Sequence, residues 1–271
     1  MTLLFELTFF LYLFVAVSYL VFFFNQNPQI QILARYGMVV AAVSHLGYTL
    51  VRYLGVGYTP ITSNHEAVSF FALAVCLSYL SFRWRYQVKN FGVFVSPIVF
   101  ALMVVAYFSS TKAVELSPVL QSLWLPVHAS IAILANAFLT LAFCGGVMYL
   151  LQEREIKGKH FGMIYTRLPS LESLDNLNNH CLATGFTLLT LGIITGSFWA
   201  KQAFGAYWQW DPKETWSLIT WFIYAAILHQ RFTSGWRRRK AAIMAIIGFA
   251  VVLFTFWGVN FMLGGIHSYA G

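Results

Sequence analysis

The chain has 271 residues, of which 59% are hydrophobic and only 10% are charged, and its mean hydropathy is +0.69. A soluble domain needs more polar residues than this to cover its surface, so the composition excludes an ordinary soluble protein and predicts a lipid bilayer as the solvent. The formal net charge of +8 is compatible with nucleic-acid binding, but basic residues in a membrane protein usually mark cytoplasmic loops.

Eight apolar runs are each long enough to cross a hydrocarbon core of about 30 Å. The first run has no basic residue before it and no small-residue cleavage site after it, so we interpret it as a retained span and not as a signal peptide. The eight runs lie near 3–24, 35–55, 67–84, 91–109, 127–151, 180–200, 215–233 and 241–264. We therefore predict an all-α, polytopic integral membrane protein with about eight transmembrane helices and a single transmembrane domain over residues 1–271.

The basic residues predict the orientation, because short loops rich in Lys and Arg stay on the cytoplasmic side. With both termini placed outside, thirteen of the 17 Lys and Arg residues fall in cytoplasmic segments. These are Arg35, Arg83, Arg85, Lys89, Arg154, Lys157, Lys159, Arg167, Arg231, Arg237, Arg238, Arg239 and Lys240. The topology thus explains the positive charge, and no support for nucleic-acid binding is left.

The loop between the sixth and seventh runs is rich in aromatic residues and lies outside in this topology. Five of the nine tryptophans fall between residues 199 and 221: Trp199, Trp208, Trp210, Trp216 and Trp221. An interfacial aromatic belt explains one or two such residues at a helix end, but not so dense a cluster. Asp211, Pro212 and Glu214 form an N-capping pattern for the seventh helix, which would hold the tryptophans as a rigid apolar shelf suited to a flat aromatic ligand.

The sequence from Trp208 through Asp211-Pro-Lys-Glu-Thr-Trp216 to Trp221 resembles the tryptophan-rich WWD signature of haem-handling proteins. It is most similar to that of the CcsA/ResC branch of cytochrome c biogenesis, known as System II, and the resemblance extends through nearly the whole chain. The branch implies that haem b is bound as a substrate by the loop at about 199–221. The residues that it implies in this contact are Trp199, Trp208, Trp210, Asp211, Trp216 and Trp221.

Histidines supply the candidate iron ligands. His128 begins the fifth run and His267 follows the eighth, so the topology places both near the aromatic loop at the outer surface. Each alone is more typical of an interfacial hydrogen-bonding residue, but the resemblance implies that the two form an outer axial pair. His65, His160 and His180 are not assigned to iron.

Two further histidines lie inside spans, where an ionisable side chain is a functional candidate. His229 lies fifteen residues after Glu214, which corresponds to about 22 Å along a helix. For His229 the resemblance implies a haem ligand within the membrane. His45 is either a second ligand at that inner site or a core histidine bonded to a neighbouring helix, because a partner can supply the second ligand. Arg52 either reaches the surface or pairs with a haem propionate.

The predicted function is haem transport and presentation for covalent attachment to apocytochrome c at the outer face. The resemblance implies a subunit of a holocytochrome c synthase that works with a CcsB/ResB-type membrane protein on the CxxCH segment of the apocytochrome. The alternatives are a haem exporter or chaperone without attachment activity, in the manner of CcmC, and an ordinary transporter or structural subunit. The resemblance implies a bacterial cytoplasmic or thylakoid-type membrane, with the haem site facing the periplasm or outside.

Cysteine usage bears on the same hypothesis. Cys76, Cys144 and Cys181 each stand alone in or beside an apolar stretch, without a CxxC pair. They are typical of small buried hydrophobic residues. Reduction of the apocytochrome thiols is therefore expected to depend on other, thiol-reducing proteins, and no residue of this chain is predicted to be a covalent catalyst.

Overall fold

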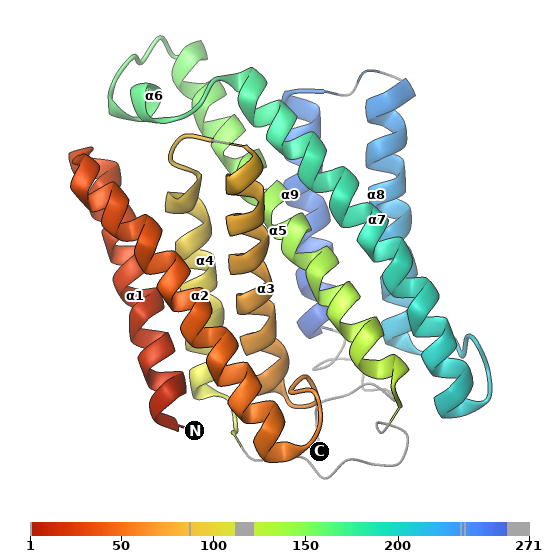
Figure 1. Cartoon of the computed structure of the whole chain (residues 1–271). Coiled ribbons are helices and arrows are strands. Elements are labelled where there is room, and N and C mark those ends of the chain that lie inside the picture. The colour runs from red at the N-terminus through yellow and green to blue at the C-terminus, as the bar shows by residue number, and fades with distance from the viewer. Residues whose placement is uncertain (1, 87, 112–121, 234, 236, 259–271) are drawn as a thin grey trace. The chain divides into compact units, whose positions relative to one another are not determined.

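The computed structural model describes residues 2–86, 88–111, 122–233, 235 and 237–258. The chain forms two compact units, Met1–Val114 and Glu115–Gly271. The single transmembrane domain expected over residues 1–271 stays a prediction. Within each unit, successive long helices run antiparallel to one another (Figure 1).

The first unit contains the four helices α1 (Thr2–Asn25), α2 (Pro28–Val56), α3 (Asn64–Arg85) and α4 (Phe91–Phe108). Helix α1 packs against α2 and α4, and α3 packs against α4 and α2. Helix α3 is buried along most of its length, whereas one face of α1 and one face of α2 expose apolar side chains. Apolar faces of this kind suit contact with lipid.

Local sequence sets the helix ends in this unit. The side chain of Asn27 accepts a hydrogen bond from the backbone N–H of Gln29, and Pro28 occupies the first helical position of α2. Helix α3 begins with a complete capping box between Ser63 and Glu66. The two helices are thus joined by a short turn, and α2 begins seven residues earlier than the apolar run near 35–55 indicates.

The second unit contains α5 (Trp124–Lys157), the short α6 (Met163–Arg167), α7 (Leu171–Phe204), α8 (Pro212–Thr233) and α9 (Arg239–Leu253). A π-helical turn, η2 (Phe254–Gly258), continues α9. Helices α5 and α7 pack along their lengths, α9 packs on α5, and α8 contacts α7 and α9. Close packing of α5 and α7 depends on Gly185, where a Cβ atom would lie 2.6 Å from a methyl group of Leu139.

The prediction of an all-helical polytopic membrane protein is confirmed. Seven helices in the described residues are long and apolar enough to cross a membrane, namely all the long helices except α8. Helix α8 has 22 residues, but its Trp, Thr, His, Gln and Arg side chains lower its hydropathy. Both α5 and α7 also extend beyond the apolar runs near 127–151 and 180–200, because α5 continues to Lys157 and α7 begins at Leu171.

Candidate functional site

His128 lies in the second turn of α5 and is half-buried against α7. Its Nδ1 atom is 2.8 Å from the backbone oxygen of Gly192. The imidazole is parallel to the indole of Trp199, with 4° between the ring planes and 6.2 Å between the centroids. A hydrogen bond and a ring contact thus fix the orientation of this histidine at the end of the unit where α5 begins and α7 ends.

Trp199 belongs to the packed interior and not to an exposed shelf. Its side chain is only 3% exposed, and its ring meets that of Phe204 edge-on at 5.4 Å. Helix α7 ends five residues later, at Phe204. The next residue, Gly205, has a φ of 83°, which is typical of a left-handed cap. The chain then turns into the aromatic loop.

Trp208 and Trp210 are the two tryptophans of the loop itself. Trp210 has a φ of 58°, an uncommon value for a bulky residue, and its side chain is 71% exposed. Trp208 meets it edge-on at 5.8 Å, and the buried Nε1 of Trp208 has no hydrogen-bond partner among the described residues. The loop therefore offers one exposed indole face and, beside it, one buried N–H donor.

Asp211 caps α8 as the sequence pattern predicts. It is 6% exposed, its carboxylate accepts from the backbone N–H of Lys213 at 3.0 Å, and its backbone oxygen accepts from Thr215 at 2.9 Å. The carboxylate of Glu214 accepts from the backbone N–H of Gln209 at 2.8 Å. Both acids therefore tie the loop to the first turn of α8.

We expect Asp211→Ala to lower the free energy of unfolding by about 1 kcal/mol, because an N-cap acceptor is lost. Asp211→Asn keeps an acceptor oxygen at the same place and should lose clearly less. Thermal unfolding of the purified chain in detergent measures both values. Equal losses for the two variants would show that the charge of Asp211, and not its capping bond, stabilises the loop.

Trp216 and Trp221 lie on α8 itself. The ring of Trp216 packs against Phe254 of η2, with 4.5 Å between centroids. The Nε1 atom of Trp221 donates to the hydroxyl of Thr190 on α7 at 2.9 Å. These two residues therefore fasten α8 to its neighbours below the loop. No sequence pattern indicated the role of Thr190.

His229 lies near the opposite end of α8, and its side chain is exposed. The buried residues of the same helix, which include Tyr224, Leu228 and Arg231, face the other helices of the unit. Arg231 pairs there with Asp175 of α7 at 2.9 Å. The imidazole of His229 therefore lies outside the packed interior of this unit, on the exposed face of α8.

His45 of α2, by contrast, is completely buried in the first unit. Its Nε2 is 2.9 Å from the hydroxyl of Ser69 on α3, and its Nδ1 is 3.3 Å from the hydroxyl of Tyr12 on α1. Both ring nitrogens therefore bond to neighbouring helices. This is the geometry of the core histidine that the sequence left as one of two alternatives.

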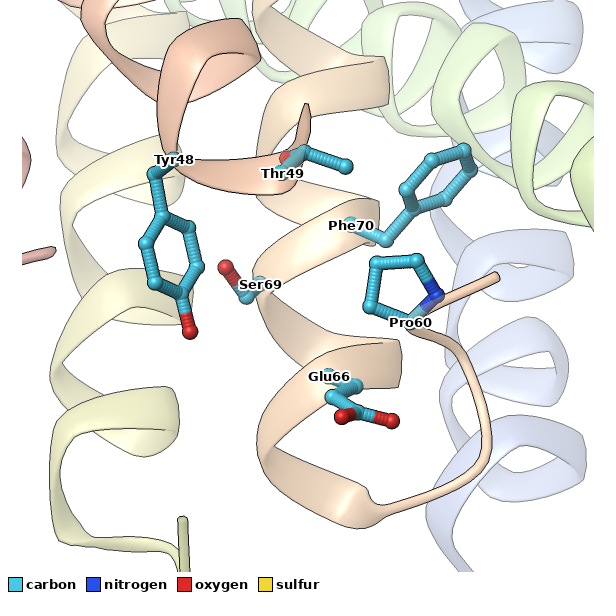
Figure 2. A pocket seen from close by; sticks show the side chains of 6 residues that line it. All are labelled: Tyr48, Thr49, Pro60, Glu66, Ser69 and Phe70. Atoms are coloured by element: carbon cyan, nitrogen blue, oxygen red, sulfur yellow. The ribbon is translucent and has the colours of Figure 1, made fainter. Parts of the chain in front are cut away.

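A second buried histidine, His65, lies at the start of α3. It bonds to the hydroxyl of Tyr48 at 2.8 Å and to the backbone oxygen of Ala106 at 2.7 Å. Tyr48 also lines a cavity of about 10 Å³ with Glu66 and Ser69, shown in Figure 2. That volume holds about one water molecule.

Arg52 forms a buried ion pair with Glu66 at 2.8 Å, and their side chains are 10% and 1% exposed. Arg52 also donates to the backbone oxygen of Thr111 at 3.1 Å. The sequence left its partner open, and the structure shows an acidic residue of the same unit. Helical spacing offered one signal for this cluster, because His45, Tyr48 and Arg52 recur every three or four residues along α2.

His267, the other expected member of the outer pair, lies outside the described residues. The three cysteines, Cys76, Cys144 and Cys181, are buried, as their sequence context predicts. Within the second unit, the structure brings His128 and Trp199 together beside the loop that carries Trp208, Trp210 and Asp211.

These features define a polytopic helical membrane protein with a histidine and a tryptophan-rich loop at one end of a helix pair. A family model described as cytochrome C assembly protein matches residues 62–267. The chain belongs to the CcsA family of cytochrome c biogenesis proteins.

The relatives match along most of their length. The cytochrome c biogenesis protein CcsA of Guillardia theta is 35% identical over 256 residues, which cover 86% of this chain and 84% of the relative. CcsA of a Synechococcus strain is 31% identical over 305 residues, which cover 89% and 87%. A solved structure, the cytochrome c haem lyase CcmF, shares the fold with a TM-score of 0.65. It is 19% identical, and the match covers 94% of this chain and 46% of CcmF.

Proposed function

We propose that this protein transports haem and presents it at the outer face of the membrane for covalent attachment to apocytochrome c. Its place in the CcsA family supports this function, and one observation carries it furthest. His128 is held by Gly192 and Trp199 directly beside the tryptophan-rich loop.

The bond to Gly192 determines the tautomer of His128. A backbone carbonyl can only accept, so Nδ1 carries the proton and Nε2 carries the lone pair in the neutral imidazole. Histidines that bind metals usually donate their other N–H to such an acceptor, which orients the ring and increases its basicity. His128 therefore has the arrangement expected of an axial ligand to haem iron, with Nε2 as the ligating atom.

The loop fits a flat aromatic substrate. Trp210 provides an exposed indole face, and the buried Nε1 of Trp208 is a donor that a polar group of the substrate can satisfy. Asp211 and Glu214 hold this loop against α8, so the two indoles keep their positions when the substrate binds. We propose His267 as the second axial ligand, from the family resemblance.

The proposed chemistry at this site is addition of the two thiols of a CxxCH segment across the two vinyl groups of haem. Each addition forms one carbon–sulfur bond and places the thiol hydrogen on the other vinyl carbon. The reactive carbons belong to haem, and the protein contributes position and electrostatics. Axial histidines also tune the iron potential.

His229 fits an inner haem site that a second protein completes. The imidazole of His229 is exposed on α8, so a second protein can reach it. We propose that a CcsB/ResB-type membrane protein supplies the opposing ligand, and that haem passes from this site to His128. His45 is not part of the proposed path, because Ser69 and Tyr12 occupy both of its ring nitrogens.

Haem content of the chain purified with a CcsB-type partner tests this proposal. We expect His229→Ala to lose most of the haem at both sites, because haem would reach the outer site through the inner one. His45→Ala, the matched control in the first unit, should keep its haem. Absence of haem absorbance in the wild-type complex would disprove the function. Holocytochrome formation by the partner alone would show that this chain only carries haem and does not take part in its attachment.

A further inference from the structure

Gly196 lies on α7, one helical turn after Gly192, and directly faces the imidazole of His128. A Cβ atom at Gly196 would lie 2.7 Å from Cε1 and 2.8 Å from Nδ1 of His128. Non-bonded carbon atoms pack best at about 3.5 to 4.0 Å. The ring therefore occupies space that any other residue at position 196 would fill.

We infer that Gly196 is a positioning residue for His128, which lets the imidazole lie flat against α7 and reach the carbonyl of Gly192. This inference rests on the proposed role of His128 as an iron ligand. Gly196 would touch neither haem nor the reacting atoms. It would act only by keeping the His128 ring in place. In that position Nδ1 donates to the carbonyl of Gly192, and this bond sets the direction in which Nε2 points.

If a larger residue replaces Gly196, the His128 ring is the group that must move, because its neighbours are fixed. Trp199 lies parallel to it and is 3% exposed, so this indole has little room to yield. Helices α5 and α7 also pack closely at Gly185, where a Cβ atom would lie 3.3 Å from the backbone oxygen of Ala135. A methyl group at position 196 should therefore displace the imidazole and break its 2.8 Å bond to Gly192.

Gly196→Ala tests the inference, with Gly47→Ala as the matched control. A Cβ atom at Gly47, on α2 in the first unit, would meet nothing within 4 Å. Both variants replace Gly by Ala inside a long helix, so the gain in helix propensity is matched. We expect Gly196→Ala to weaken haem binding at the outer site by about 10- to 100-fold and to change the axial-ligand spectrum. Gly47→Ala should do neither.

A double-mutant cycle with His128→Ala separates positioning from a general packing defect. If Gly196 acts only through the imidazole, Gly196→Ala should have no further effect on haem content in the His128→Ala background, where the ring is gone. A further loss in that background would overturn the inference. A Gly196→Ala protein with the haem content and spectrum of Gly47→Ala would also overturn it.

Failure of the proposed function gives a different result. If His128→Ala by itself leaves the outer haem and its spectrum unchanged, His128 is not the ligand, and the proposed function fails together with the inference. If His128→Ala removes the outer haem while Gly196→Ala does not, only the role of Gly196 is wrong.

Discussion

His128→Ala is expected to remove haem from the outer site and to abolish assembly of c-type cytochromes. The variant deletes the proposed ligating atom, Nε2, and removes the ring N–H that His128 donates to the carbonyl of Gly192. Haem bound through His229 should remain, because His229 lies near the other end of α8. Absorption spectra of the complex purified with its partner, together with the yield of holocytochrome, measure both effects.

Added imidazole is the sharpest control for this variant. Removal of the His128 ring leaves an empty space next to Gly196, and a free imidazole molecule of the same size can bind there. Partial recovery of the spectrum and of holocytochrome yield indicates that the side chain acts as a ligand. Full cytochrome assembly by His128→Ala without imidazole would contradict the assignment.

Glu66→Gln and Arg52→Gln are each expected to lower the free energy of unfolding by about 3 to 5 kcal/mol, because each leaves a buried charge uncompensated. The pair is 2.8 Å apart, and Glu66 also accepts from the hydroxyl of Thr62 at 3.0 Å. Thermal or denaturant unfolding of the purified chain measures the loss. In the double variant the losses should be less than additive.

Lys157→Gln is the exposed control for the buried pair. Lys157 forms an ion pair with Glu153 at 3.0 Å, but its side chain is 60% exposed, so the loss should be below about 1 kcal/mol. Haem content per folded molecule should be unchanged in Arg52→Gln. If Arg52→Gln instead loses outer haem at normal stability, Arg52 pairs with a haem propionate, the alternative that the sequence left open.

Some features followed from local sequence because short-range chemistry determines them. The apolar runs predicted the long helices, since bilayer thickness requires about 20 apolar residues in each span. The order Asp211, Pro212, Glu214 predicted the start of α8, because a side-chain oxygen and a fixed φ act within one turn. Polar helix ends were harder to predict. Helix α7 begins at Leu171, nine residues before the apolar run near 180–200, because its first turns are polar.

Other features depended on contacts between distant residues. His45 and His229 are both histidines within apolar runs, yet the structure buries the first between Ser69 and Tyr12 and exposes the second on α8. The rotation of each helix about its axis decides this difference. Packing against neighbouring helices sets that rotation.

By itself, the sequence determined the membrane class, the positions of the long helices, the family resemblance and the aromatic loop. Only the tertiary structure decided which ring nitrogen of His128 carries its proton, because the acceptor is the carbonyl of Gly192, 64 residues away along the chain. It also decided that Trp199 is interior while Trp210 is exposed, and that Arg52 pairs with Glu66. Each of these outcomes depends on which faces of two helices meet, and composition and spacing along one helix do not contain that information.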